Sequence, residues 1–516
     1  MRTGGESAHA AGSALDHAAP RGCARRVIDP LRKLVRHSAV YGIGTILPRL
    51  LALILVPIYT RQLTMAEYGV LSLLVVAQSA IAIVAQLGLG SALFREVLYE
   101  GTREDHVLGT AAIALTVVAS GVVAVGLAAA VPLARTALGG AEHAPVLRLA
   151  FVASGLSVFQ PLAMAHLRIH QRSAAYSALS VAQFAVLGAL SVWFVAVRNH
   201  GLAGLMWANI LAGALFAAVS LGLLLPRMTL TVDWPALRRM LKMGRPNVVV
   251  GLAALVLASA DRFLLGHFGS KETVAQYALG YNVALGMNLA VQAVQLSWPA
   301  QLYLLARREG GTAIMARLTT LYAAGMGLVG LGLVVLAPEI VALLAPSSYA
   351  GAARVVPLVV AAYLLYGLRF MTNSALEIRN EVGRAIPIVL CAATLNLALN
   401  LWWIPDHGLV GAAWATLVAY AVLLAGQAAL NHYLMPIPYQ LRRLAIVVVI
   451  WTALAWAGTR LPDAPLALAL ASKAGLLAAY PLLLALGGVI DARERRLVRE
   501  RLGARWGSAR GKRVTR

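Results

Sequence analysis

The chain has 516 residues, of which 60% are hydrophobic and 13% charged, and its mean hydropathy is +0.76. This balance excludes a water-soluble protein, because no soluble core could bury so much apolar sequence. The net charge of +23 would suggest nucleic acid in a soluble protein, but here the basic residues flank apolar segments. We therefore predict contact with anionic membrane lipids and no nucleic-acid partner.

In chain order, a polar segment over residues 1–36 predicts a disordered, basic cytoplasmic tail. Apolar segments follow, each long enough to cross ~30 Å of hydrocarbon as a helix. We expect about fourteen of them, near residues 38–58, 69–91, 107–130, 146–167, 175–197, 203–225, 247–267, 276–304, 319–338, 355–377, 386–405, 409–431, 444–459 and 466–489. The predicted fold class is therefore an all-α polytopic membrane protein.

The basic residues predict how this bundle is oriented. With an even number of spans both termini share a side, and that side carries 33 Lys and Arg residues against six on the other. By the positive-inside rule both termini are predicted to be cytoplasmic, as are residues 310 and 439. The final segment, 490–516, interleaves arginines with leucine and valine, which predicts an amphipathic helix lying on anionic lipid.

An internal repeat suggests two similar halves. Residues 200–208 read HGLAGLMWA and residues 407–415 read HGLVGAAWA, an offset of 207 residues. Each copy opens the sixth helix of its half. We therefore expect two six-helix lobes related by a parallel repeat around a central cavity. The predicted parts are an N-lobe at 37–225, a basic cytoplasmic elbow at 226–246, a C-lobe at 247–432 and two extra helices within 433–489.

Two phrases carry a resemblance to a known family. Residues 41–74, YGIGTILPRLLALILVPIYTRQLTMAEYGVLSLL, resemble the first two helices of bacterial polysaccharide-unit flippases. Residues 260–266, ADRFLLG, resemble the DRF-type segment of that family. The resemblance covers roughly residues 36–435.

The resemblance implies the two-lobed fold of the multidrug/oligosaccharidyl-lipid/polysaccharide exporter superfamily in a bacterial cytoplasmic membrane. It also implies a substrate, an undecaprenyl-diphosphate-linked oligosaccharide turned from the cytoplasmic to the outer leaflet for O-antigen, capsule or exopolysaccharide synthesis. Glycosyltransferases and a polysaccharide polymerase are the partners to expect.

Polar residues deep in the spans are the candidate site residues, because an arginine at a helix centre costs about 2.5–3.5 kcal/mol on insertion scales. Arg49 is predicted to face the cavity and meet an anionic lipid diphosphate; the alternative is a structural pair or a snorkelling side chain. Arg369, Asn373 and Glu377 follow at steps of four, so they share one helix face. That face either lines the cavity or forms polar contacts with a neighbouring helix.

Two amide pairs have the same two interpretations. They are Asn288 with Gln292, and Asn396 with Asn400. Amides at this spacing can bind sugar hydroxyls or join one helix to another. Asp261 and Arg262 lie near the external end of their span, where they either gate the cavity or anchor the helix.

The sequence predicts no cofactor, no metal and no enzyme. His170, His200 and His407 are isolated in loops, there is no Walker-type loop, and no predicted external loop exceeds about 20 residues, which leaves little room for an active site. A cation-coupled multidrug exporter of the same fold is the main alternative, and a peptidoglycan-precursor flippase is a variant of the flippase interpretation. Spans one to six lack a mid-depth carboxylate for cation coupling, so the sign of the charges favours an anionic substrate.

Overall fold

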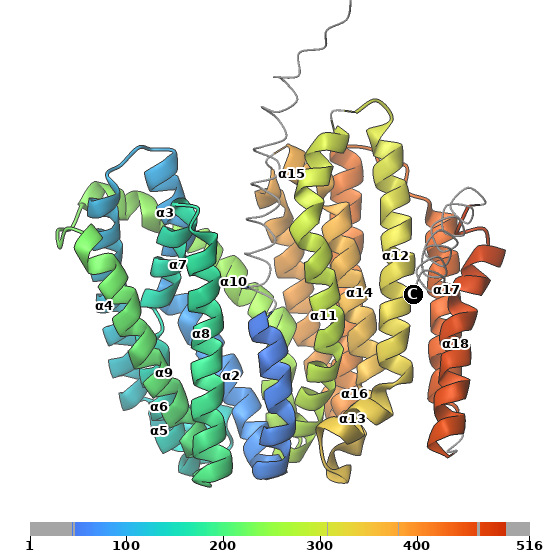
Figure 1. Cartoon of the computed structure of the whole chain (residues 1–516), viewed down its shortest axis with the longest axis horizontal. Helices are drawn as coiled ribbons and strands as arrows, with labels where there is room; N and C mark the ends of the chain where they lie inside the picture. Colours follow the sequence, from blue (N-terminus) through green and yellow to red (C-terminus); the bar gives the residue numbers. More distant parts are fainter. Residues whose placement is uncertain (1–43, 45–46, 307, 380, 462–464, 492–516) are drawn as a thin grey trace, which may run out of the picture.

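The computed structural model describes residue 44 and residues 47–306, 308–379, 381–461 and 465–491 (Figure 1). Within these ranges the chain is helical, without a strand, and eleven helices are long and apolar enough to cross a membrane. The chain is therefore a multi-pass membrane protein, as predicted, while the count of fourteen spans stays a prediction. The predicted tail at 1–36, and 490–516 beyond its first two residues, lie outside the described part.

The first half of the chain forms one lobe, on the left in Figure 1. It contains helix 47–62, α2 (Met65–Gln86), α3 (Leu89–Leu98), α4 (Glu104–Ala128), α5 (Ala130–Ala137), α6 (Ala144–Leu156), α7 (Phe159–Ile169), α8 (Ser173–Val192) with η2 (Trp193–Val197), and α9 (Gly201–Leu224).

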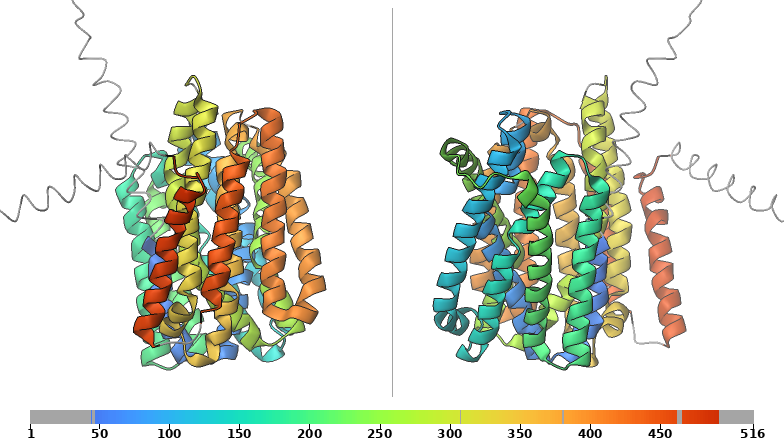
Figure 2. Two further views of the ribbon diagram at one scale, coloured as in Figure 1. Left: turned by 90° about the vertical axis from the view of Figure 1, so that its right-hand side faces the viewer. Right: turned by 60° about the vertical axis from the view of Figure 1, so that its left-hand side comes forward.

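The second half forms the other lobe. It contains α10 (Trp234–Phe268), α11 (Lys271–Ala306), α12 (Gly311–Val335), α13 (Ala337–Leu344), η4 (Ser347–Arg354), α14 (Val356–Thr372), α15 (Ser374–Ile378) and α16 (Ile386–Leu434). The two extra helices, α17 (Leu441–Thr459) and α18 (Leu466–Leu486), lie on the outside of this lobe (Figure 2). We call the end of the bundle that carries α13 the lower end and the end that carries α15 the upper end, as in Figure 1.

Local sequence fixes where α2 begins and ends. The Thr64 hydroxyl accepts from the backbone N–H of Glu67, whose carboxylate accepts from the backbone N–H of Thr64, so the two residues form a capping box. The helix ends at residue 86, before the predicted boundary at 91, because Leu87 and Gly88 both adopt positive φ (+51° and +67°) and a new helix follows. A Cβ on Gly88 would lie 2.8 Å from the carbonyl oxygen of Gly244, so this close backbone approach also requires glycine.

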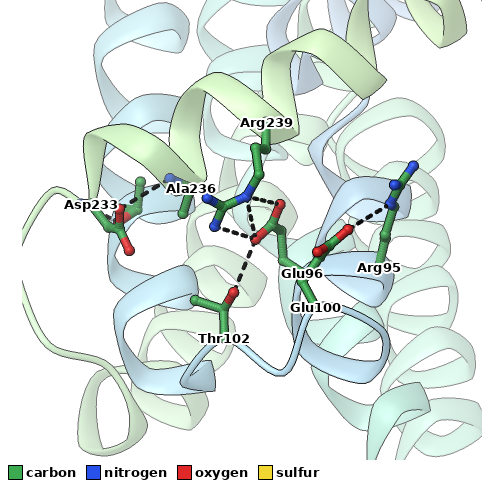
Figure 3. A network of polar contacts seen from close by, with 8 residues as sticks. Arg95, Glu96, Glu100, Thr102, Asp233, Ala236 and Arg239 are labelled. Atoms are coloured by element: carbon green, nitrogen blue, oxygen red, sulfur yellow. Dashed lines mark hydrogen bonds and ion pairs between the residues drawn. The ribbon is translucent and has the colours of Figure 1, made fainter.

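The second half of the predicted elbow over 226–246 is helical. α10 runs without a break from Trp234 to Phe268, and its upper part packs on the N-lobe while its lower part packs on α16. Figure 3 shows a contact between α10 and the N-lobe: the Arg239 guanidinium donates to both oxygens of Glu96 on α3, at 3.0 and 2.9 Å, and Thr102 donates to the same carboxylate. Glu96 is only 3% exposed, so this fork-to-fork pair fixes α10 against α3.

The two copies of the repeat occupy matching turns at the lower end. Gly201 begins α9 with φ +53°, and Gly408 divides α16 with φ +54°, so the predicted eleventh and twelfth spans meet at this kink. Glycine adopts positive φ at little cost, which explains why both copies keep it directly after a histidine. The duplication itself remains a prediction.

The two lobes meet at the lower end and diverge toward the upper end (Figure 1). At the lower end, the Thr60 hydroxyl donates to the Leu344 carbonyl at 2.6 Å, and Asn282 donates to the Tyr68 hydroxyl at 2.9 Å. The ring of Tyr68 also stands edge-on to that of Tyr349, 5.9 Å between centroids. Helix 47–62 contacts both lobes, as α10 does: Leu55 lies beside Gly188 of α8, and the lower end of the helix bonds to α13.

The structure gives the topology prediction two sites for labelling. Glu309 is exposed at the upper end and His407 is exposed at the lower end. In a chain whose Cys23 and Cys391 are replaced by serine, an impermeant maleimide applied to spheroplasts should label His407→Cys at once and Glu309→Cys only after lysis, because the upper end carries the basic excess. Immediate labelling of Glu309→Cys would reverse the predicted orientation.

Candidate functional site

Three arginines lie around one group of tyrosines in the C-lobe. Arg49 lies on helix 47–62 of the N-lobe, and Arg262 and Arg369 lie on α10 and α14 of the C-lobe. At 1.5 Å per residue, Arg49 and Arg369 each lie about 20 Å from the lower ends of their helices, and Arg262 lies about 9 Å from the lower end of α10. All three side chains are half-buried. Arg49 and Arg369 therefore lie equally far along their helices from the lower ends.

Tyrosine rings support these arginines. The guanidinium carbon of Arg262 lies 5.1 Å from the Tyr281 ring centroid, and that of Arg369 lies 5.3 Å from the Tyr366 ring centroid. Arg49 is close enough to Tyr363 and Tyr366 to interact with them electrostatically. A ring face attracts a cation without occupying its N–H groups. The tyrosines therefore hold the guanidinium groups in place and leave donors free.

The charges of Arg49 and Arg369 are not balanced by carboxylates. Among the residues that the structure describes, none of the three arginines forms an ion pair, and the buried Nε atoms of Arg262 and Arg369 have no hydrogen-bond acceptor. Asp261 offsets part of the Arg262 charge because it is the adjacent residue. The region between the lobes therefore presents an excess of positive charge with unused donors, which suits an anion.

Asp261 is part of a hydrogen-bond network inside the C-lobe. It is 1% exposed, and its carboxylate accepts from the Tyr277 hydroxyl, from the Thr416 hydroxyl at 3.3 Å and from the backbone N–H of Arg262 at 2.8 Å. Thr416 lies on the part of α16 after the kink. The network thus joins α10, α11 and α16 behind Arg262, so Asp261 positions that arginine.

The other predicted site residues fall into two groups. The amide of Asn373 faces Glu377 at 3.4 Å where α14 gives way to α15, on the same side as Arg369 but nearer the upper end, and Gln292 donates to Asn288 on α11. By contrast, Asn396 and Asn400 are 1% and 0% exposed and bond to each other on α16, where it packs against α10 and α14. The structure does not bring this last pair to the arginines.

A cavity lies in each half of the bundle. One of about 500 Å³ lies inside the N-lobe, between helix 47–62, α2, α6, α8 and α9, and its described lining contains no charged side chain but has the amides of Gln78, Gln183 and Asn209. The other, about 1190 Å³, lies between the C-lobe and α17–α18 and is mostly apolar. At its lower end Lys473 forms an ion pair with Glu339.

Residues 34–295, just over half of the sequence, match the family described as polysaccharide biosynthesis protein. The chain belongs to this family. A search of curated protein sequences found no match.

Solved structures show the fold that this family member shares. The lipid II flippase MurJ in an inward closed conformation superposes with a TM-score of 0.67 at 9% identity, over 88% of this chain and 99% of that one. An outward-facing multidrug resistance MATE family transporter of the MOP superfamily superposes with a TM-score of 0.57 at 16% identity, over 81% of this chain and 97% of that one. A MOP superfamily transporter from Pyrococcus furiosus superposes with a TM-score of 0.58 at 16% identity, over 81% of this chain and 97% of that one. The binding pocket of that transporter is described as reversed in polarity. The predicted fold class is confirmed.

Sequence reasoning missed the tyrosines of this polysaccharide biosynthesis protein. Tyr363 and Tyr366 precede Arg369 by six and three residues, and Tyr277 and Tyr281 are four apart, so each pair lies near one helix face. That spacing was a usable signal. The partnership of Tyr281 with Arg262 joins α11 to α10, however, and no periodicity within one helix predicts it.

The network around Asp261 gives a stability prediction. In Asp261→Ala the buried Tyr277 hydroxyl loses its acceptor, so we expect the free energy of unfolding to fall by about 1–3 kcal/mol. Asp261→Asn keeps one acceptor oxygen and should lose less. Thermal unfolding of the purified protein in detergent measures both, and an Asp261→Ala variant that melts with the parent would show that the network does not stabilise the lobe.

Proposed function

We propose that this family member is a flippase that moves an undecaprenyl-diphosphate-linked oligosaccharide from the cytoplasmic to the outer leaflet of a bacterial cytoplasmic membrane. The observation that carries the proposal is the pair Arg49 and Arg369. They lie on different lobes, equally far from the lower ends of their helices, without a neighbouring carboxylate. A diphosphate supplies the missing negative charge between them, and two planar guanidinium forks suit its several oxygens.

The sign of the site favours this substrate over a cationic drug. A cation placed near Arg49 or Arg369 would meet like charge in a medium of low dielectric constant, where repulsion is strong. The described lining of the N-lobe cavity offers no carboxylate to bind a coupling cation. Its amides and hydroxyls instead suit neutral sugars, since each amide can both donate and accept.

The lipid tail of the proposed substrate needs an apolar surface outside the lobes. The cavity of about 1190 Å³ beside α17 and α18 is lined mainly by leucine, valine, alanine and tryptophan. A polyprenyl chain has no polar atoms, so such a lining can cover part of it without leaving a hydrogen bond unmade. The two extra helices would then contact the lipid tail, while the two lobes bind the headgroup.

Alternating access follows from the two-lobed arrangement. The lobes, about 37–225 and 247–432, are joined at the lower end in this conformation. We take the lower end to be the outer side of the membrane. The headgroup would enter from the upper, cytoplasmic end, and rocking of the lobes would then open the lower end. Glycosyltransferases supply the substrate and a polymerase consumes the product in such a process.

Deleting the gene in its own host tests the proposal. Surface polysaccharide should disappear, and diphosphate-linked oligosaccharide should accumulate in the inner leaflet; re-expression of the chain should restore export. Unchanged surface polysaccharide together with increased sensitivity to cationic drugs would instead support the multidrug exporter. Arrested peptidoglycan synthesis with accumulating lipid-linked precursor would point to the peptidoglycan variant.

A further inference from the structure

Three potential metal ligands meet at the upper end of the N-lobe, away from the arginines. Glu104 begins α4, His166 lies in the last turn of α7, and His170 caps that helix. The Nδ1 atom of His166 lies 2.7 Å from one carboxylate oxygen of Glu104, and the Nε2 atom of His170 lies 2.9 Å from the other. The expectation that His170 stands alone is therefore wrong.

The geometry of this cluster suits one ion. The two histidines are four residues apart, so their rings share a face of α7, 4.6 Å between centroids. The three ligand atoms lie within 4.8 Å of one another. A tetrahedral ion with ligands at about 2.0–2.1 Å separates them by roughly 3.3 Å, so small side-chain rotations suffice. The carboxylate and the two imidazoles then exchange their mutual hydrogen bonds for metal bonds.

We propose that Glu104, His166 and His170 bind a zinc-class divalent transition metal, with water as a fourth ligand. Two histidines and one glutamate form a known zinc ligand set that leaves one position open. His166 is buried and His170 is nearly half exposed, so the site is anchored inside the lobe and reachable from solvent. A pocket of about 420 Å³ beside it has room for the water.

The surrounding charges set the selectivity. Arg103, Asp105, Arg172 and Arg227 line the same pocket, and Arg103 is paired with Asp105 at 2.8 Å. Arg172 and Arg227 are therefore the cations that oppose a divalent ion. Mg²⁺ and Ca²⁺ prefer oxygen ligands and find one carboxylate in the cluster itself, whereas Zn²⁺ and Co²⁺ gain from the two imidazoles. We therefore expect the site to bind Zn²⁺ and Co²⁺ but not Mg²⁺ or Ca²⁺.

The bound ion would fasten α4 to α7 beside the connection between the lobes. The backbone N–H of Thr229 donates to the Asp105 carbonyl at 3.1 Å, and the Thr110 hydroxyl donates to the Thr231 carbonyl at 3.2 Å. The segment before α10 thus rests on the first turns of α4. A metal at Glu104 should therefore stabilise the folded lobe at the point where α10 leaves it.

Metal content and thermal stability test the proposal on the full chain purified without a histidine tag. After equilibration with Zn²⁺ and removal of the excess, the parent should hold about one Zn²⁺ per chain, and its melting temperature should rise with Zn²⁺ but not with Mg²⁺. Co²⁺ should give the visible absorption of a tetrahedral site. His170→Ala and Glu104→Gln should each reduce the Zn²⁺ content at least tenfold, while His407→Ala, an exposed histidine at the other end, should keep it.

His170 is nearly half exposed, so His170→Ala should fold even if a change at buried His166 does not. A parent chain without bound Zn²⁺ or Co²⁺ would overturn the proposal. Zn²⁺ content unchanged in both His170→Ala and Glu104→Gln would overturn it as well, since the ion would then be bound elsewhere. A melting temperature that rises equally with Mg²⁺ would contradict the proposed ligand preference.

Discussion

Arg49→Ala is expected to abolish surface glycan export while the amount of folded protein in the membrane stays the same. The alanine removes one of the two uncompensated charges that we assign to the diphosphate. It also removes an arginine that costs about 2.5–3.5 kcal/mol to insert at a helix centre, so insertion should not suffer. Arg49→Lys should keep part of the activity, because the charge remains but the planar fork is lost.

The measurement is surface glycan per folded protein molecule in the gene-deleted host. Arg148→Ala is the matched control, because Arg148 is an exposed arginine of another N-lobe helix and lies away from the tyrosines. It should export like the parent. A structural role for Arg49 predicts the opposite pattern, with less folded Arg49→Ala protein and near-normal export per molecule, and that result would end the proposed substrate contact.

Locking the lower end should stop transport completely. Arg61 donates to the Leu343 carbonyl at 3.2 Å across the lobe boundary, and both residues are exposed. A short, reducible bifunctional reagent that joins Arg61→Cys to Leu343→Cys holds helix 47–62 against α13. If the lobes rock, the outer side cannot open. Export should then fall in proportion to the cross-linked fraction and return on reduction.

A cross-link at the same end but within one lobe provides the control. Gln276 donates to the Ser348 carbonyl at 3.1 Å, and both residues belong to the C-lobe. Joining Gln276→Cys to Ser348→Cys should leave export intact, because it restrains no motion between lobes. Full export with complete Arg61–Leu343 cross-linking would rule out rocking at this boundary.

The sequence predicted the membrane class and most helix positions, because hydropathy over about 20 residues reflects the bilayer itself. The sequence did not predict helix boundaries and kinks that depend on contacts between helices or on single backbone angles. The arginine-rich segment before residue 247 was predicted as a connection between the lobes, but its second part belongs to α10, where Arg239 forms an ion pair with the buried Glu96. The kink in α16 depends on the backbone angles of one glycine, which hydropathy does not detect.

The candidate site was predictable in part, since intramembrane charge is rare and therefore informative. Arg49, Arg262 and Arg369 were all identified as candidates, but the nearness of Arg49 to Tyr363 and Tyr366 depends on how the two lobes meet. The amide pairs show that residue spacing alone does not predict which side chains are accessible. Asn288 with Gln292 and Asn396 with Asn400 have the same step of four, yet only burial separates a half-exposed pair from one packed inside the lobe.

Leaflet-to-leaflet movement in reconstituted vesicles tests the central claim most directly. Vesicles containing the purified chain and an undecaprenyl-diphosphate-linked oligosaccharide are treated with a glycosidase that reaches only the outer leaflet. The account predicts that the inner-leaflet lipid becomes cleavable with the parent chain, while Arg49→Ala vesicles behave like protein-free ones. Cleavage limited to the outer leaflet with the parent chain, in vesicles that do transport a cationic drug, would contradict the account.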